Sequence, residues 1–407
     1  MIKVITDKDS VRELLTRGVE RIYPSYAELE KKLLSGDRIR LYCGYDPTAP
    51  ALHIGNAISI NKLGQFQALG HEVIFLIGDF TGLIGDPTDK KASRRKMTRE
   101  EVLANARDYQ KQASAYLKFD GDNPAKILYN SQWNDKLTFA DVIELSSNFT
   151  VQQMIQRDMF QERLKEEKPI YLHEFLYPLT QGYDSVAMDV DLEIGGNDQM
   201  FNMMCGRDLL KILKNKEKFV LTMKLLSDEN GKKMGKSEGN VIFLNEEPNN
   251  MYGQAMSWPD GVIITAFELC TNVASAEITA LAADWKKDKI NPRDLKMKLA
   301  REITKINYGE KAAAAAQENF IKTVQKKELP SEMDKISIAK QKLVDALADN
   351  KLVGSKSEAR RLLTQGAIKV KIDQNDFAVV KDSDFMLDFS EEAIVQYGRL
   401  KFIKFTK

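Results

Sequence analysis

The chain has few of the residues that most often build metal and disulfide sites. Its 407 residues include three cysteines and three histidines. Cys43, Cys205 and Cys270 lack the spacing of a metal or redox motif, and their odd number argues against a disulfide framework. So few histidines also argue against a histidine-based metal site. We therefore expect no resident metal and three reduced, buried cysteines.

Long apolar runs and a strong net charge are also absent. No apolar stretch approaches the ~20 residues that span a bilayer, and the formal net charge is +1. The first ten residues are charged and have no apolar centre, unlike a secretory signal. We expect a cytoplasmic protein without membrane contact, whose nucleic-acid surface, if it has one, is a local patch.

Strand and helix patterns alternate in the first half of the chain. Residues 38–43 and 73–77 have the length and composition of strands, and apolar residues recur at helical spacing over 57–69. Strand, helix and strand in this order indicate a parallel sheet with a right-handed crossover. Residues 11–36 have a helical pattern that precedes the sheet. Further strands are expected at 126–129 and 190–194, with helical insertions at 140–165 and 172–183.

The second half of the chain changes character twice. Helical patterns extend from residue 249 to about residue 324, and a charged, proline-containing stretch follows. A helix, a glycine and a strand then recur near the end. We expect an α/β domain with a doubly wound parallel sheet at 1–228, a mobile loop and α-helical domain at 229–325, a linker at 326–338, and a small α+β domain at 339–407.

The most informative segment runs from Leu41 to Asn56. An apolar strand ends there, a turn rich in Gly and Pro follows, and His53-Ile54-Gly55 opens a helix. His53 and Asn56 lie three residues apart and share one side of the first helical turn. A helix N-terminus favours phosphate, and open parallel sheets bind ligands beyond the carboxyl ends of their strands. The plainer interpretation is that His53 only caps the helix.

Two basic segments could meet the same phosphates. One is Lys233-Met234-Gly235-Lys236-Ser237, and the other is a cluster of Lys and Arg that includes Lys90 and Arg94. Lysine and arginine neutralise phosphate charge, and a glycine in a loop adds backbone freedom. Taken alone, each segment could equally be a solvated basic turn.

Together these segments resemble the ATP-binding signatures of class I aminoacyl-tRNA synthetases, which have Rossmann-like catalytic domains. The usual His-x-Gly-His ends here in Asn56, whose amide can donate a hydrogen bond from nearly the same place. Gly235 likewise replaces the middle serine of Lys-Met-Ser-Lys-Ser. The resemblance implies ATP with Mg²⁺ as a substrate. It assigns transition-state stabilisation to His53, Asn56, Lys90, Arg94, Lys233, Lys236 and Ser237, and ATP binding to Gly44, Asp46, Gly55, Gly196, Asp198 and Lys236.

Other residues sharpen the resemblance to tyrosyl-tRNA synthetases. Tyr42 and Asp184 match the pair that hydrogen-bonds the substrate phenol, and Asp86, Tyr177 and Gln181 match the set that grips its α-ammonium group. Tyr177, Gln181 and Asp184 are spaced i, i+4 and i+7, on one face of a helix. Gln199 is expected near the tyrosine. Singly, Tyr42 could be an ordinary strand aromatic and Asp184 an ordinary helix carboxylate.

The last segment resembles the S4 RNA-binding domain that many bacterial tyrosyl-tRNA synthetases carry. Between residues 354 and 371 several basic side chains face a single acid, Glu358. Such a patch would bind RNA phosphates in a salt-sensitive way. The candidate RNA-binding residues are Lys356, Arg360, Arg361 and Lys369. The plainer interpretation is a solvated basic helix.

We therefore expect a bacterial tyrosine–tRNA ligase that forms tyrosyl-adenylate and transfers tyrosine to tRNA(Tyr). The resemblance also implies a homodimer, with residues 140–165 as the candidate surface. Asn56 is also found in tryptophan-specific relatives, so that specificity stays open. Two further hypotheses stay open as well: a small nucleotidyltransferase with the His-x-Gly-His motif, and a synthetase-derived RNA-binding protein without activation activity.

Overall fold

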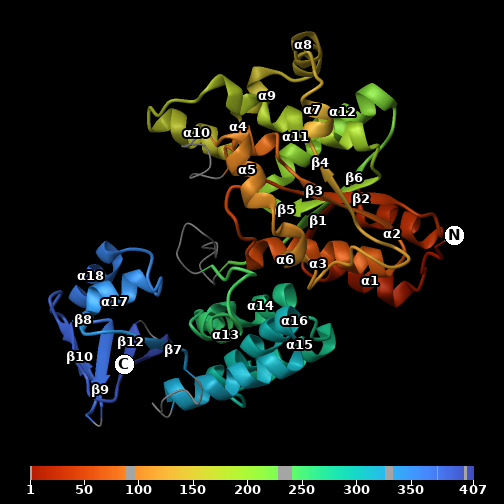
Figure 1. Ribbon diagram of the computed structural model, residues 1–407. Helices are drawn as coiled ribbons and strands as arrows, with labels where there is room; N and C mark the ends of the chain where they lie inside the picture. Colours follow the sequence, from red (N-terminus) through yellow and green to blue (C-terminus); the bar gives the residue numbers. More distant parts are fainter. Residues whose placement is uncertain (1, 89–96, 228–240, 326–332, 374, 398–400) are drawn as a thin grey trace. The chain divides into compact units, whose positions relative to one another are not determined.

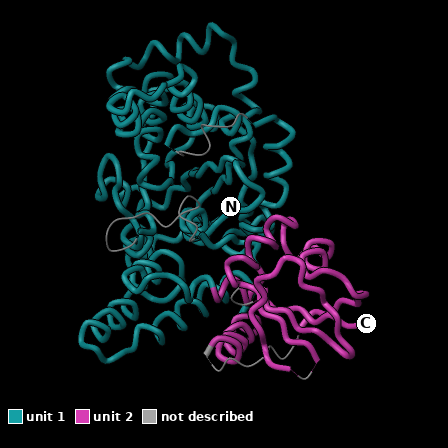
Figure 2. The backbone as a smooth tube through the Cα atoms, turned by 90° about the vertical axis from the view of Figure 1, so that its left-hand side faces the viewer, with its two compact units in different colours: residues 1–246, 254–309 teal, residues 247–253, 310–407 magenta. Residues whose placement is uncertain are grey.

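The structure is a computed structural model that describes residues 2–88, 97–227, 241–325, 333–373, 375–397 and 401–407. By their internal contacts these residues form two compact units. The first contains Met1–Glu246 and Gln254–Gly309, and the second contains Glu247–Gly253 and Glu310–Lys407 (Figure 2). The predicted helical domain is thus shared between the two units, and the four-part division of the chain stays a prediction.

A six-stranded sheet is the centre of the first unit, with strand order β1-β6-β5-β2-β3-β4. All neighbouring strands are parallel except β1, which pairs antiparallel with β6 at the edge. The strands are β1 (Val19–Tyr23), β2 (Arg40–Tyr45), β3 (Glu72–Ile77), β4 (Lys126–Tyr129), β5 (Leu192–Gly196) and β6 (Phe219–Met223). The chain proceeds outward from β2 in one direction and from β5 in the other. The crevice between the carboxyl ends of β2 and β5 is therefore the switch point at which such sheets bind ligands.

Helices cover both faces of this sheet, with α3 on one face and α11 and α12 on the other (Figure 1). The α-helices of the first unit are α1 (Lys8–Thr16), α2 (Tyr26–Leu34), α3 (Ile54–Ala68), α4 (Thr81–Ile84), α5 (Arg99–Ala106), α6 (Tyr109–Ala113), α7 (Ser131–Asn134), α8 (Phe139–Ser147), α9 (Val151–Ile155), α10 (Asp158–Lys165), α11 (Tyr177–Met188), α12 (Met200–Lys214), α14 (Ile263–Cys270) and α15 (Ser275–Lys286). The 3₁₀ turns found among the described residues of this unit are η2 (Leu172–Phe175), η3 (Asn197–Gln199) and η4 (Asp260–Val262). This arrangement confirms the predicted α/β class with a largely parallel sheet.

The prediction of a purely helical lead-in over 11–36 is wrong. Residues 19–23 of this segment form β1, between α1 and α2. The strand is half-exposed and pairs only with β6. An edge strand of five residues has no continuous apolar run, so its sequence does not stand out from the amphipathic helices beside it. The predicted strand at 126–129 coincides with β4, and the other strands predicted for this sheet are displaced by one or two residues.

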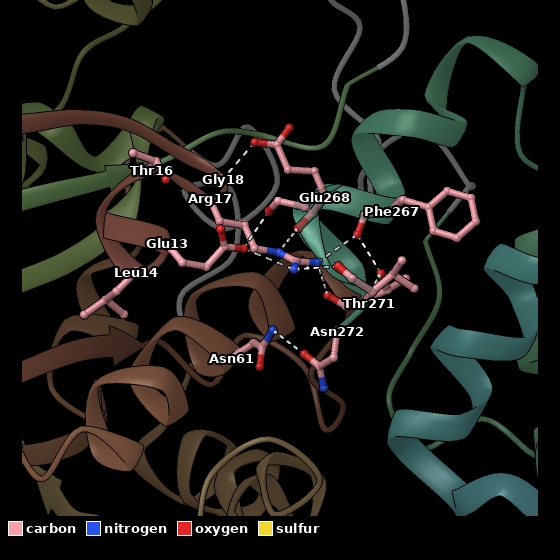
Figure 3. Close-up of polar contacts among 12 residues, drawn as sticks. Glu13, Leu14, Thr16, Arg17, Gly18, Asn61, Phe267, Glu268, Thr271 and Asn272 are labelled. Atoms are coloured by element: carbon pink, nitrogen blue, oxygen red, sulfur yellow. Dashed lines mark hydrogen bonds and ion pairs between the residues drawn. The ribbon is translucent and has the colours of Figure 1, made fainter. Parts of the chain in front are cut away.

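Arg17 attaches the start of the chain to the end of α14. Its guanidinium donates to four main-chain carbonyls that follow or end this helix (Figure 3). The acceptors are Glu268, Val273, Phe267 and Thr271, at 3.1, 2.7, 3.3 and 2.6 Å. The last carbonyls of a helix have no intrahelical partners, so one buried guanidinium satisfies several of them at once. These contacts explain why residues 263–273 belong to the same compact unit as the sheet.

The second unit contains a five-stranded sheet with order β10-β9-β12-β13-β7 and a two-stranded sheet, β11-β8. Its elements are β7 (Lys335–Ser337), β8 (Gln341–Lys342), α17 (Leu343–Asp349), α18 (Lys356–Thr364), β9 (Ile368–Ile372), β10 (Ala378–Val379), β11 (Met386–Leu387), β12 (Glu392–Tyr397) and β13 (Phe402–Thr406). Two helices, α13 (Pro248–Met256) and α16 (Pro292–Phe320), contribute residues to both units, and the π-helix η5 (Ile321–Gln325) follows α16. Strand β7 lies inside the predicted linker at 326–338, and it pairs in parallel with β13. The C-terminal part of the chain thus contains both helices and strands, and the bounds of the domain at 339–407 stay a prediction.

No helix within the described ranges is long and apolar enough to span a membrane.

Candidate active site

A cavity of about 1040 Å³ opens at the carboxyl ends of β2, β3 and β5. Every predicted tyrosine- or ATP-binding residue that the structure describes lines it. These are Tyr42, Gly44, Asp46, His53, Gly55, Asn56, Asp86, Tyr177, Gln181, Asp184, Gly196, Asp198 and Gln199. They come from distant parts of the chain, so the fold brings together the residues that the motifs grouped.

Five predicted residues lie outside the described residues: Lys90, Arg94, Lys233, Lys236 and Ser237. The chain on either side of 228–240 is described, and the part that precedes this segment lies at the cavity. Leu225 and Leu226 line it, and the Ile54 N–H donates to the carbonyl of Ile242 at 2.9 Å. Leu244 donates in turn to Leu52. These two hydrogen bonds hold residues 242–244 beside the start of α3.

His53 and Asn56 form a reciprocal cap at the start of α3. The Asn56 N–H donates to His53 Nδ1 at 3.3 Å, and the His53 N–H donates to Asn56 Oδ1 at 3.0 Å. His53 therefore does cap α3, as the plainer interpretation of the sequence predicted. With its oxygen held by the backbone, Asn56 keeps its amide N–H₂ as the donor group. Both side chains still line the cavity, where a helix N-terminus attracts a phosphate.

Asp46 joins β2 to the neighbouring elements. Thr81 Oγ1 donates to its Oδ1 at 2.6 Å, and the Tyr177 hydroxyl donates to its Oδ2 at 2.8 Å. Gly78 makes this possible, because a Cβ there would lie 1.9 Å from Asp46 Oδ1. Burial raises the pKa of Asp46 to about 7, against the opposing effect of the two hydrogen bonds. Asp46 thus fixes Tyr177 on one side of the cavity.

The buried end of the cavity contains Tyr42 and Asp184. Asp184 is 2% exposed, and three N–H donors hold its carboxylate. Trp133 Nε1 and Asn134 Nδ2 donate to Oδ1 at 2.7 and 3.1 Å, and Asn130 Nδ2 donates to Oδ2 at 3.2 Å. Burial still raises the pKa of Asp184 to about 8. The Tyr42 hydroxyl lies 2.9 Å from Ser185 Oγ, and burial raises the pKa of Tyr42, so its phenol is neutral.

Another part of the cavity lining presents oxygen acceptors. Gln181 Nε2 donates to Glu193 Oε1 at 3.1 Å, and Gln181 Oε1 has no partner within the described part of the chain. Gln199 Nε2 donates to Asp86 Oδ2 at 2.7 Å, while Asn202 donates to Gln199 Oε1 at 2.9 Å. The amide of Gln181 is thus oriented with its oxygen available as an acceptor. Together with the nearby carboxylates, it suits a ligand cation such as an ammonium group.

Several site-forming residues were missed by sequence reasoning. Asn130, Trp133, Asn134, Ser185, Glu193 and Lys218 hold the predicted residues in place but belong to no motif that was recognised. For most of them the sequence carries no signal, because a partner from another element decides their role. Glu193 and Lys218 are exceptions. A charged residue inside or beside a buried, apolar strand is unusual and could have been singled out.

The predicted RNA-binding residues lie in the second unit, on or near α18. Lys356 pairs with Asp345 at 2.8 Å and with Asp349 at 3.9 Å, and Arg361 pairs with Glu358 at 3.9 Å. The prediction counted one neighbouring acid, but α17 supplies two more. The patch is therefore less basic than its own sequence indicates, and within the described residues no ion pair is found for Arg360 or Lys369.

No group of three or more His, Cys, Asp or Glu side chains within the described ranges is arranged to hold a metal. All three cysteines are buried and free. The cavity contains both acceptors and neutral donors, but none of its described side chains is a serine or cysteine paired with a base. The arrangement suits binding and charge stabilisation rather than covalent catalysis by the protein.

Comparisons with known proteins agree with this geometry. A family described as class I tRNA synthetases (W and Y) matches residues 34–325. A protein named tyrosine–tRNA ligase from Thermotoga maritima is 41% identical over 402 residues, with 98% of each chain covered. Another of the same name from Moorella thermoacetica is 42% identical over 397 residues, covering 96% of this chain and 94% of that one.

Solved structures show the same fold. A C-terminally truncated mitochondrial tyrosyl-tRNA synthetase from Coccidioides posadasii has a TM-score of 0.61 at 24% identity, over 76% of this chain and 91% of that one. A tyrosyl-tRNA synthetase from Archaeoglobus fulgidus, complexed with L-tyrosine, has a TM-score of 0.60 at 23% identity. The match covers 76% of this chain and the whole of that one.

Proposed function

The chain belongs to the class I tRNA synthetases of the W and Y family, and we propose that it attaches L-tyrosine to tRNA(Tyr) at the expense of ATP. Relatives named tyrosine–tRNA ligase match it over nearly the whole length of both chains. The enzyme first forms tyrosyl-adenylate and pyrophosphate. It then transfers the tyrosyl group to the 3′-terminal adenosine of the tRNA.

The observation that best supports tyrosine is the buried pair of Tyr42 and Asp184. Both line the cavity, and both are almost completely excluded from solvent. A phenol placed between them can donate to the carboxylate and interact with the Tyr42 hydroxyl. Phenylalanine would offer neither group a hydrogen bond at this position. Sites that read a hydroxyl in this way, tyrosine-specific synthetases among them, discriminate by roughly 10⁴–10⁵.

The amino acid's ammonium group meets the acceptors at the other side of the cavity. Gln181 Oε1, Asp86 and Tyr177 are the proposed contacts, with Gln199 holding Asp86 in place. An ammonium ion among carboxylates stabilises their charged forms and is itself stabilised. This arrangement directs the substrate carboxylate toward the start of α3.

The nucleotide occupies the part of the cavity near α3 and the turn after β5. His53 and the Asn56 amide contact the α-phosphate, and Gly44, Asp46, Gly55, Gly196 and Asp198 accommodate the adenosine. Lys90, Arg94, Lys233, Lys236 and Ser237 neutralise the leaving pyrophosphate. Mg²⁺ arrives with ATP as part of the substrate.

The chemistry needs positioning and charge stabilisation more than proton transfer. The tyrosine carboxylate forms a new P–O bond at the α-phosphorus while the bond to pyrophosphate breaks. A ribose hydroxyl of the tRNA then attacks the tyrosyl carbonyl, and AMP leaves. Holding the reacting groups together and neutralising the departing charge account for most of the acceleration in such reactions.

The enzyme works in the cytoplasm as a homodimer. Large apolar side chains project from the helices after β4: Phe139, Ile143 and Val151 are 81%, 56% and 69% exposed. Leu172, just beyond α10, is 81% exposed. Exposed apolar patches mark protein-binding surfaces, and Ile143 and Val151 fall within the predicted surface at 140–165. The three free, buried cysteines suit a reducing compartment.

The tRNA contacts include the second unit. Lys356, Arg360, Arg361 and Lys369 bind RNA phosphates, with the greater part of the attraction from Arg360 and Lys369. Such contacts carry shape-led rather than base-specific recognition.

Amino-acid-dependent ATP–pyrophosphate exchange tests the proposal. Tyrosine, phenylalanine and tryptophan are compared, with Lys236→Ala as the control that disables activation. Exchange with tyrosine alone, lost in the control, supports tyrosine specificity. Exchange with tryptophan would show that the protein is specific for tryptophan, the alternative that Asn56 suggested. No exchange with any of the three would favour an RNA-binding protein without activation activity.

A further inference from the structure

Lys218 and Glu193 form an ion pair inside the first unit. Lys218 lies directly before β6 and its side chain is completely buried, while the Glu193 side chain, in β5, is 3% exposed. The two strands are neighbours in the sheet. Glu193 lines the cavity, whereas Lys218 lies behind it. Neither residue belongs to the motifs that identified the site.

Stability alone does not account for such a pair. Removing two charges from water costs about as much free energy as their attraction returns, and apolar replacements of similar volume are often neutral or stabilising. The protein nevertheless leaves room for the pair. A Cβ on Gly206 of α12 would lie 2.7 Å from Lys218 Nζ and 2.8 Å from Ser185 Oγ. The surrounding helices are thus shaped to admit the amine.

Glu193 contacts one side of the tyrosine-binding cavity with each of its oxygens. Its Oε1 accepts from Gln181 Nε2 at 3.1 Å, and its Oε2 accepts from Ser185 Oγ at 3.3 Å as well as from Lys218. Lys218 Nζ also donates to Ser185 Oγ at 2.8 Å. Ser185 in turn lies 2.9 Å from the Tyr42 hydroxyl. One carboxylate is therefore linked directly to Gln181 and, through a single serine, to Tyr42.

We propose that Lys218 and Glu193 are positioning residues that set both ends of the tyrosine site, the Gln181 amide for the ammonium group and the Tyr42 hydroxyl for the phenol. This inference rests on the proposed tyrosine specificity. Lys218 neutralises the charge of Glu193, and its amine donates a hydrogen bond to Ser185 Oγ. Glu193 fixes which end of the Gln181 amide faces the cavity. Without the lysine, the buried carboxylate would compete for the donors that orient the substrate.

The experiment compares Lys218→Met, Glu193→Gln and Ser185→Ala in the full-length protein. Pyrophosphate exchange gives kcat and KM for tyrosine, phenylalanine and ATP. We expect the ratio of kcat/KM for tyrosine over phenylalanine to fall about 10-fold in each variant, since a misplaced hydrogen-bonding group loses its selectivity for the hydroxyl. The KM for tyrosine should rise in Lys218→Met and Glu193→Gln, whereas the KM for ATP should stay unchanged.

Lys62→Met is the matched control. Lys62 is also a buried lysine, 2% exposed, but its amine donates to the main-chain carbonyls of Leu14 and Arg17. Its loss should lower thermal stability and leave the tyrosine-to-phenylalanine ratio as in the wild type. A purely structural role for Lys218 would make the two lysine variants behave alike.

The double variant Lys218→Met/Glu193→Gln adds a second readout. Because the two residues act as a unit, the double variant should lower the selectivity for tyrosine by less than the product of the two single effects. If Lys218→Met does not fold, Ser185→Ala removes only one hydroxyl and tests the same link to Tyr42. Folded variants with unchanged selectivity and tyrosine KM would overturn the inference. Failure of the wild type to exchange with tyrosine would instead overturn the proposed function.

Discussion

Lys218 in the first unit and Lys356 in the second are both lysines with carboxylate partners, but their surroundings differ completely. The Lys218 side chain is fully buried, whereas the Lys356 side chain is 50% exposed and its partners Asp345 and Asp349 are at least partly exposed as well. A buried charge is weakly screened and holds its neighbours in one geometry, while an exposed pair is screened by water and salt. The tyrosine-binding cavity should therefore depend strongly on single groups, and the basic surface of the second unit should depend weakly on each.

The largest effect is expected for Asp184→Asn. The change replaces an acceptor oxygen by an N–H₂ group among three donors, those of Trp133, Asn130 and Asn134. We expect kcat/KM for tyrosine in pyrophosphate exchange to fall about 100-fold, because the substrate phenol loses its buried acceptor, with little change for phenylalanine. Asp191→Asn, at the amino end of β5 outside the cavity, is the control. Equal losses for the two amino acids would show that Asp184 does not read the phenol.

Asn56→Asp separates capping from catalysis at the start of α3. An aspartate oxygen can still accept the His53 N–H, so the cap and the thermal stability should be retained. The amide donor is lost, however, and a negative charge faces the α-phosphate. We expect kcat for pyrophosphate exchange to fall roughly 10- to 100-fold. Asn61→Asp, on the same helix, is the control, and an unchanged kcat in Asn56→Asp would leave Asn56 with a capping role only.

The pH dependence of stability follows from the same burial. The pKa of Asp184 is about 8 in the folded protein and 3.8 ordinarily, so the folded state holds a proton that the unfolded state releases. This contribution to the unfolding free energy is fully present below about pH 4 and is lost as the pH rises to about 8. Asp46, with a pKa of about 7, acts in the same direction. The Tm of the ligand-free protein should fall as the pH rises from about 5 to 8. The variant Asp184→Asn should show a smaller fall in Tm over the same range. If the Tm of the variant and of the wild type fall equally, Asp184 is ionised throughout.

The smallest effects are expected in the second unit. Arg360→Ala should raise the KM for tRNA in aminoacylation a few-fold. It should also lower the slope of log KM for tRNA against log salt concentration by about 1, since one phosphate contact is lost. Lys356→Ala should do less, because two aspartates already neutralise this lysine. Pyrophosphate exchange should be unchanged in both. A larger effect for Lys356 than for Arg360 would mean that RNA displaces the aspartates.

The sequence predicted the site better than it predicted what supports the site. Tyr177, Gln181 and Asp184 were placed on one helix face by their spacing, and α11 does present all three to the cavity. Lys218, Glu193 and Ser185 could not be connected from their spacing, since the residue before β6, strand β5 and helix α11 come together only in the folded protein.

The same limit explains the errors in the fold. Strands β2, β3 and β4 contain apolar runs that mark them, and they were predicted within one or two residues. Strand β1 was missed because its identity depends on pairing with β6, which lies far along the chain. The charge of the patch on α18 was overestimated because α17 contributes Asp345 and Asp349, which lie outside the segment that was counted.

The most direct test of the contrast between the two regions is one salt series on the wild-type protein. The KM for tyrosine in pyrophosphate exchange and the KM for tRNA in aminoacylation are measured at the same salt concentrations. We predict a nearly constant KM for tyrosine, because its contacts are buried, and a steeply rising KM for tRNA, because its contacts are exposed. A KM for tyrosine that rises in step with that for tRNA, or a KM for tRNA that does not change, would contradict this account.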